Sequence, residues 1–229
     1  MSAAPGYFGK LPGAGDFVQR RLPPEFLDPW DRAFSQAVAS ARDRLGARWS
    51  EAYRGAPAWR FLLSPGIAGR EAWCGVLLPG IDRVGRCFPM VVAARVDSLA
   101  HPGVLADGGS WYDAATAVAW AAQADPGIDA ARFDAAIAAL GLPASLDEPT
   151  LPALPPGIDR SRRGLWLSWP EQDRRLPAAL WGHLSGEGCS LWWHPGDFGA
   201  AGALYLGRGL PDATAFIGFL RADARAEVA

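Results

Sequence analysis

The chain contains few of the residues from which metal sites and disulfide frameworks are built. It has three cysteines and three histidines in 229 residues. They are Cys74, Cys87 and Cys189, and His101, His183 and His194. An odd number of well-separated cysteines argues against a disulfide framework and favours a reducing compartment. With no CxxC pair and scattered histidines, we predict no metal site and no cofactor.

Charge of one sign and long apolar runs are also lacking. The formal net charge is −2, which argues against a general nucleic-acid binder. No stretch of eighteen apolar residues occurs, so we expect no membrane insertion. The first residues have neither the basic region nor the apolar region of a signal peptide. We therefore expect a cytoplasmic protein.

Catalytic signatures are missing as well. A phosphate-binding loop around Gly9-Lys10 would need glycine at Ala4 and serine or threonine at Leu11. No Gly-x-Ser-x-Gly elbow is present. We predict that the chain is not an enzyme and has no catalytic residues. A hydrolase that uses Cys74 or Cys189 is kept as a less favoured alternative, because triads assemble in space.

Tryptophan, glycine and proline are abundant instead, with 11, 27 and 20 copies. The apolar stripe Trp30, Phe34, Val38, Ala41 and Leu45 predicts a helix over residues 29–49, capped by Asp28. Strands are expected at 59–63, 73–78 and 88–94. The short turns between them favour an antiparallel meander.

The second half predicts helices over 110–124 and 129–140, the latter capped by Asp129. Strands are expected at 164–170, 190–195 and 203–206, the first two of which look alike and could pair. Asp212 could cap a final helix that ends near Leu220.

The fold class is therefore α/β in the α+β sense. We expect a mainly antiparallel central sheet with helices packed on its faces, a layered sandwich. The predicted domains are a core at 1–142, a Pro-rich connector at 143–163, and a Trp-rich β region at 164–229 packed on the core as one unit.

Two features have both a binding and a structural interpretation. In the loop at 82–86 (DRVGR), arginine forks suit carboxylate or phosphate recognition. Alternatively, Asp82 caps the turn and pairs with one arginine internally. Strand alternation sends one of Trp192 and Trp193 outward, either as a binding anchor or beneath a covering segment.

Taken together, several ordered motifs resemble the TagF (ImpM) family associated with bacterial type VI secretion. They are residues 6–12 (GYFGKLP), 15–18 (GDFV), 29–31 (PWD), 45–46 (LG), Trp49, Tyr53, Pro57, 59–61 (WRF), Trp73, 75–77 (GVL), Pro79, 82–86 (DRVGR) and 88–89 (FP). The resemblance covers about residues 6–95. One departure is Gly80, where the family pattern has serine, so no role of that hydroxyl carries over.

The resemblance implies a cytoplasmic accessory protein that represses type VI secretion after translation. It implies binding to the forkhead-associated scaffold protein of the secretion system, within a threonine-phosphorylation pathway. A repressor of this kind needs an exposed patch with a few anchors rather than an active site. The candidate partner-binding residues are Lys10, Asp16, Phe17, Trp30, Asp82, Arg83 and Arg86.

Two alternatives accompany this assignment. The motifs could simply preserve the fold, and we favour that interpretation for the glycines and for Trp30. The protein could also bind a small anionic ligand or a phosphopeptide through the 82–86 loop, with Arg83, Arg86 and backbone amides of the N-terminal turn.

Overall fold

A computed structural model describes residues 4–96, 109–143, 164–169, 176–184, 188–196 and 202–221. Their strands form one eight-stranded sheet in the order β2-β1-β5-β4-β3-β7-β8-β6, and every pairing is antiparallel. The strands are β1 (Gly6–Lys10), β2 (Phe17–Arg20), β3 (Trp59–Leu63), β4 (Ala72–Leu78), β5 (Met90–Val96), β6 (Leu165–Trp169), β7 (Cys189–His194) and β8 (Gly202–Arg208).

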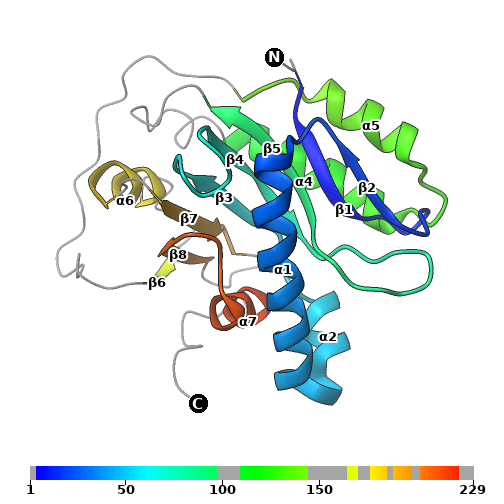
Figure 1. Cartoon of the computed structure of the whole chain (residues 1–229), viewed down its shortest axis with the longest axis horizontal. Helices are drawn as coiled ribbons and strands as arrows, with labels where there is room; N and C mark the ends of the chain where they lie inside the picture. The colour runs from blue at the N-terminus through cyan, green and yellow to red at the C-terminus, as the bar shows by residue number, and fades with distance from the viewer. Residues whose placement is uncertain are drawn as a thin grey trace.

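Helices cover both faces of this sheet (Figure 1). One face carries α1 (Pro24–Leu45), η1 (Gly46–Arg48), α2 (Trp49–Arg54) and α7 (Ala213–Arg221). The other carries α4 (Gly109–Ala124), α5 (Ala130–Ala139) and α6 (Leu176–Leu184). Two apolar cores result, one on each side of the sheet. The predicted α+β sandwich is therefore confirmed.

Both tryptophans of the adjacent pair in β7 are buried, which corrects the expectation of an outward ring. Trp192 is 0% exposed and lies beside Trp30 of α1, with ring centroids 6.1 Å apart. Trp193 is 3% exposed and meets Tyr112 of α4 at 5.1 Å. Alternation does separate the two rings. Because helices cover both faces of the sheet, neither ring reaches solvent.

Helix α1 begins earlier than predicted. It starts at Pro24, with Pro23 rather than Asp28 at the N-cap, and Pro29 lies inside it. Phe26 explains the extra turn, because its ring stacks on Trp30 at 5.0 Å and extends the buried stripe upstream. Pro29 is the sixth residue of the helix, so it removes one interior hydrogen bond, the one to the Glu25 carbonyl, and the packing of Phe26 on Trp30 offsets this cost.

Short-range predictions elsewhere are confirmed. Asp129 accepts a hydrogen bond from the Arg132 N–H at 2.7 Å and caps α5. Asp212 accepts from the Ala215 N–H at 2.8 Å and caps α7. The strands β3, β4 and β5 form the expected meander.

The predicted pairing of the two Trp-rich segments is wrong, because β8 lies between β6 and β7 in the sheet. Strand β7 pairs with β3, so the C-terminal strands extend the sheet of the N-terminal region. Residues 144–163, nearly all of the predicted connector, lie outside the described residues. The domain boundary there stays a prediction.

Candidate functional site

The candidate residues of the N-terminal turn are held by a hairpin of β1 and β2. The register pairs Lys10 with Phe17, so both stand at the mouth of the turn. Ala14 closes the turn by donating its N–H to Leu11 O at 3.1 Å. A Cβ at Gly13 would lie 1.8 Å from the carbonyl oxygen of Ile128, so only glycine fits against that loop.

The second group of candidates lies in the loop that joins β4 and β5. Asp82 organises this loop, since its Oδ1 accepts the N–H groups of Val84 and Arg86 at 3.0 and 2.9 Å. Its Oδ2 accepts the Nε–H of Arg86 at 2.7 Å. The internal interpretation of the loop is therefore the one that the structure shows for Asp82 and Arg86.

Lys10 connects the hairpin to this loop and is the only lysine in the chain. Its ammonium lies 3.4 Å from Asp82 Oδ2 and 3.6 Å from Asp16 Oδ1. The Lys10 side chain is 5% exposed and that of Asp82 is fully buried. The connection is reinforced by a hydrogen bond from Arg86 to the carbonyl of Gly15 and by Arg83 N–H to Ala14 O at 3.0 Å.

The two carboxyl groups are held in the ionised form. Burial raises the pKa of Asp82, but hydrogen bonds from the backbone and side chain of Arg86, from Val84 and from Lys10 outweigh it and lower the pKa to about 2. The hydrogen bond from the Phe17 N–H, followed by the charge of Lys10, lowers the pKa of Asp16. Asp82 therefore forms its bonds within the protein, whereas the side chain of Asp16 is 89% exposed to solvent.

Apolar groups flank this ionic network. Phe17 stacks on Phe8 at 5.1 Å, meets Phe88 edge-on at 4.9 Å, and has the Lys10 ammonium 3.9 Å from its ring centre. Phe17 is nevertheless 41% exposed, and Val84 is 67% exposed. We call the exposed set Asp16, Phe17, Arg83, Val84 and Arg86 the hairpin–loop face.

Arg83 differs from Arg86 within this face. Its guanidinium lies against the backbone of Gly15, where a Cβ would be 3.2 Å from its terminal nitrogen. Among the described residues, its side chain forms no ion pair, whereas Arg86 is bound to Asp82. Arg86 is therefore part of the frame and Arg83 is available to a partner.

Helix α2 supports the base of the loop. The Tyr53 hydroxyl, which is buried, donates to Gly80 O and accepts from Gly80 N–H, both at 3.2 Å. A Cβ at Gly80 would lie 2.4 Å from Phe88 O. Glycine at this position fits the close backbone approach seen here.

Trp30 does not join the other candidates. It is 0% exposed and packs among Phe26, Phe34 and Phe61 in the core under α1. It is therefore withdrawn as a partner anchor. The exposed Val84 was not predicted from the sequence. The only indication of it there is an isolated apolar residue beside a charged one.

The described residues hold no cluster of three or more His, Cys, Asp or Glu side chains fit for a metal ion. Cys74 is fully buried, and burial raises the pKa of its thiol to about 12. Cys189 is 7% exposed. A small hollow of about 20 Å³ between α2 and α7 is lined by apolar side chains such as Trp59, Phe216 and Phe219.

Comparisons with known proteins agree with the motifs of the N-terminal half. Residues 6–140 match the family model described as TagF N-terminal domain, Type VI secretion system-associated. None of the curated proteins is a significant match. None of the helices in the described ranges has the length and apolar character needed to cross a membrane.

A solved structure, titled crystal structure of PA0076 from Pseudomonas aeruginosa PAO1 at 2.05 Å resolution, is similar over nearly the whole chain. It is 37% identical, with a TM-score of 0.72, and the match covers 95% of this chain and 94% of that one. With the family model spanning more than half of the residues, these findings confirm the resemblance: the chain belongs to the TagF family of type VI secretion system-associated proteins.

Proposed function

We propose that this protein is a non-enzymatic, cytoplasmic regulator that represses type VI secretion by binding the forkhead-associated scaffold protein. Membership of the TagF family supports the link to secretion. The hairpin–loop face supports a binding role, because it is a place where exposed apolar and cationic groups stand on a rigid frame. The buried Cys74 thiol, with its raised pKa, argues against Cys74 as the nucleophile of a hydrolase.

The single observation that carries the proposal is the exposure of Phe17 and Val84 beside Arg83. Aromatic residues and arginine are the common anchors of protein interfaces. Here the backbone N–H groups of Arg83 and Val84 are bonded to Ala14 and Asp82, so little backbone ordering of the loop remains to be done on binding. A partner that covers this face removes two apolar groups from water without disturbing the internal ion pairs.

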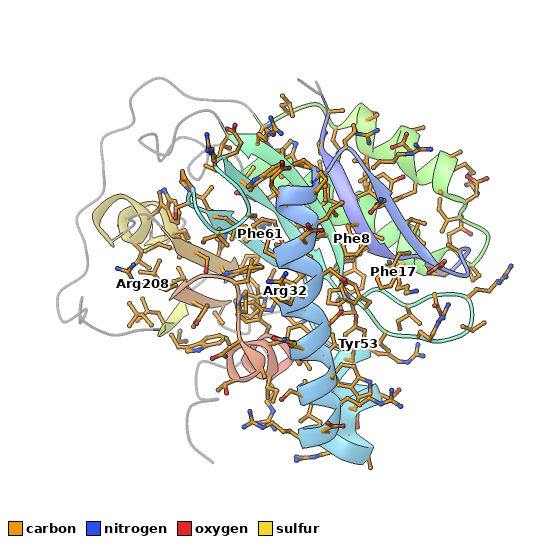
Figure 2. The ribbon with its side chains drawn as sticks, viewed as in Figure 1. Phe8, Phe17, Arg32, Tyr53, Phe61 and Arg208 are labelled. Atoms are coloured by element: carbon orange, nitrogen blue, oxygen red, sulfur yellow. The ribbon has the colours of Figure 1, made fainter. Side chains whose placement is uncertain are left out.

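The test is a pull-down and titration with the purified forkhead-associated scaffold from the same cell. Arg83→Glu and Val84→Asp change exposed side chains and should leave folding unchanged. Arg208→Glu is the matched control, since Arg208 is exposed at the end of β8, far from the hairpin (Figure 2). We expect both face variants to lose at least about tenfold in affinity, the usual effect of removing an interface anchor.

Three outcomes bear on the proposal. Loss of binding in the face variants, with the control unaffected, supports it. Binding by wild type and all variants alike moves the interface elsewhere on the molecule. Absence of binding by the folded wild type refutes the scaffold assignment itself.

A second candidate is a module that binds a small anion or a phosphopeptide, favoured by the exposed side chain of Arg83. Arginine guanidinium groups form bidentate pairs with phosphate. Thermal stabilisation by a phosphothreonine peptide, absent with its unphosphorylated form and abolished in Arg83→Glu, would favour this function. Melting curves that neither peptide changes would eliminate it.

A further inference from the structure

The two turns that carry the hairpin–loop face lie side by side and point outward. In Figure 1 the loop that joins β4 and β5 reaches outward beside the turn that joins β1 and β2. The Arg83 N–H, which donates to Ala14 O at 3.0 Å, ties the loop to this turn. Each turn is exposed over consecutive residues, at 15–17 in the hairpin and at 83–86 in the loop. The face is therefore a projection rather than a depression.

The tip of the loop is clear of the rest of the molecule. Val84 is 67% exposed, and a Cβ added to Gly85 would meet no atom within 4 Å. At Gly80, in the base of the loop, an added Cβ would lie 2.4 Å from Phe88 O. The apolar hollow between α2 and α7 is lined by none of the face residues. The loop is thus tightly packed at its base and open at its tip.

The backbone of the tip is ordered by bonds within the loop. The Asp82 carboxylate accepts the N–H groups of Val84 and Arg86. The Asp82 carbonyl accepts the Gly85 N–H at 2.9 Å, and the Asp82 N–H donates to Arg86 O at 3.0 Å. Gly85 has a φ of +84°, which glycine adopts without strain. The shape of the tip is therefore set before a partner binds, and a partner contacts its side chains.

The two side chains at the tip need different surroundings in a complex. Val84 has only methyl groups to offer, so it gains free energy where water is excluded. Arg83 has only hydrogen-bond donors to offer, and its side chain forms no ion pair with the described residues. A flat surface covers a projecting valine on one side, whereas a pocket surrounds it. Apolar walls with oxygen acceptors at the rim therefore suit both side chains.

We propose that the tip of the 82–86 loop inserts into a concave apolar pocket of the partner protein, with Val84 inside the pocket and Arg83 bonded to oxygen atoms at its rim. The inference rests on the proposed function, because it specifies the binding site on that same partner. The convex shape of the tip commits the partner to a concave site, since the anchors of protein interfaces fill pockets on the other protein. Phe17, which stacks on Phe8 beside the loop, lies at the edge of this contact.

The experiment changes the size and the polarity of one side chain. The variants are Val84→Ala, Val84→Thr and Val84→Trp, and titration calorimetry measures their affinities for the purified forkhead-associated scaffold. Threonine keeps the shape of valine and adds a hydroxyl, whereas tryptophan is much larger. Leu142→Trp is the matched control, since Leu142 is also an exposed apolar residue and follows α5, outside the face. Circular dichroism and the melting temperature confirm that all variants fold.

We expect every variant of Val84 to bind more weakly than the wild type. Alanine leaves part of the pocket empty and should lower the affinity about tenfold. Threonine places a hydroxyl among apolar walls, with a loss of similar size. Tryptophan does not fit a site shaped for valine and should lower the affinity at least about tenfold. The control should follow the wild type.

The tryptophan variant distinguishes a pocket from a flat surface. On a flat surface, tryptophan buries more apolar area than valine, so binding is retained or becomes tighter. That result would overturn the pocket while leaving the regulator assignment intact. Equal affinities for the wild type and all variants of Val84 would also overturn it, because Val84 would then lie outside the interface. If the folded wild type does not bind the scaffold, the proposed function fails and this inference fails with it.

Discussion

The replacement Asp82→Asn tests whether the buried carboxylate frames the candidate site. Asparagine keeps the shape and one oxygen, which can still accept from Val84 and Arg86 N–H. Its amide nitrogen can only donate, and it then faces two further donors, the Nε–H of Arg86 and the ammonium of Lys10. The substitution therefore removes the charge-assisted interactions that Asp82 makes with Arg86 at 2.7 Å and with Lys10 at 3.4 Å.

The expected loss of stability depends on how exposed Lys10 and Arg86 are, because both cations lose Asp82 as their partner. Each charge-assisted interaction contributes about 1.5–3 kcal/mol. Water can replace Asp82 at Arg86, which is 58% exposed, but not at Lys10, which is 5% exposed. We therefore expect Asp82→Asn to lower the free energy of unfolding by about 2–4 kcal/mol, near the range for breaking a buried pair.

The assay is urea unfolding followed by tryptophan fluorescence. With a slope of about 2–3 kcal/mol per molar urea, the midpoint should fall by about 1 M at unchanged slope. Asp16→Asn is the matched control: Asp16 also pairs with Lys10, but it is 89% exposed, and we expect no measurable shift. Equal midpoints for the two variants would refute the framing role of Asp82.

The double variant Lys10→Met/Asp82→Asn measures the interaction energy between Lys10 and Asp82, separately from the effect of each single substitution. Methionine is apolar and of similar length, so it removes the cation that Asp82→Asn strands in the interior. The double variant should be more stable than the sum of the two single effects predicts. Strictly additive effects would show that the two groups do not interact, contrary to their 3.4 Å separation.

Single positions carry four further predictions. Because the native pKa of Asp82 is about 2 against an ordinary 3.8, its contribution to stability is present above about pH 4 and is lost as the pH falls toward 2; acid titration of the wild type should show this loss and Asp82→Asn should not. Gly80→Ser should lower the melting temperature, at a cost of about 1–3 kcal/mol, because its Cβ would lie 2.4 Å from Phe88 O. Trp30→Ala should cost about 3–5 kcal/mol in urea unfolding, since it empties a fully buried site. The Cys74 thiol, with a pKa of about 12, should resist iodoacetamide at pH 8 until the protein unfolds, as mass spectrometry of the alkylated peptide would show.

Elements whose signals are local can be predicted from the sequence. Helix α5 has its cap at Asp129, and helix α7 has its cap at Asp212, because a capping carboxylate binds the backbone three residues away. The start of α1 is harder to place, because Pro29 imitates a helix start. The helix extends to Pro24 because Phe26 packs on Trp30, one turn further on, and on Trp73 of β4, with ring centroids 4.7 Å apart; no local signal encodes the second contact.

Strand order could not be predicted for the same reason. The segments around Trp166 and Trp192 look alike, yet β8 separates them in the sheet. Pairing between distant strands depends on which faces the helices cover, and Trp193 illustrates this dependence. Alternation alone assigns one of the adjacent tryptophans to solvent, but the cover supplied by α4 buries it.

Which residues form the candidate site could be predicted from the sequence better than what each of them does there. Asp82, Arg83 and Arg86 stand close together in the sequence, whereas their connection with Lys10 crosses from β1 to the loop after β4. Only the folded arrangement distinguishes the arginine that holds the frame from the arginine that faces solvent. In the sequence, Lys10, Arg83 and Arg86 are simply three cations. In the folded protein Lys10 and Arg86 pair with Asp82, whereas Arg83 faces solvent.

This division of roles decides which variants can report on binding. A variant of Arg86 removes the bond to Asp82 and the bond to Gly15 together, so a failure to bind the partner and a loosened loop would look the same. Arg83 and Val84 join the frame through their backbones, and their side chains are exposed. A binding defect in Arg83→Glu with an unchanged urea midpoint therefore locates the interface, whereas the same defect in Arg86→Ala does not.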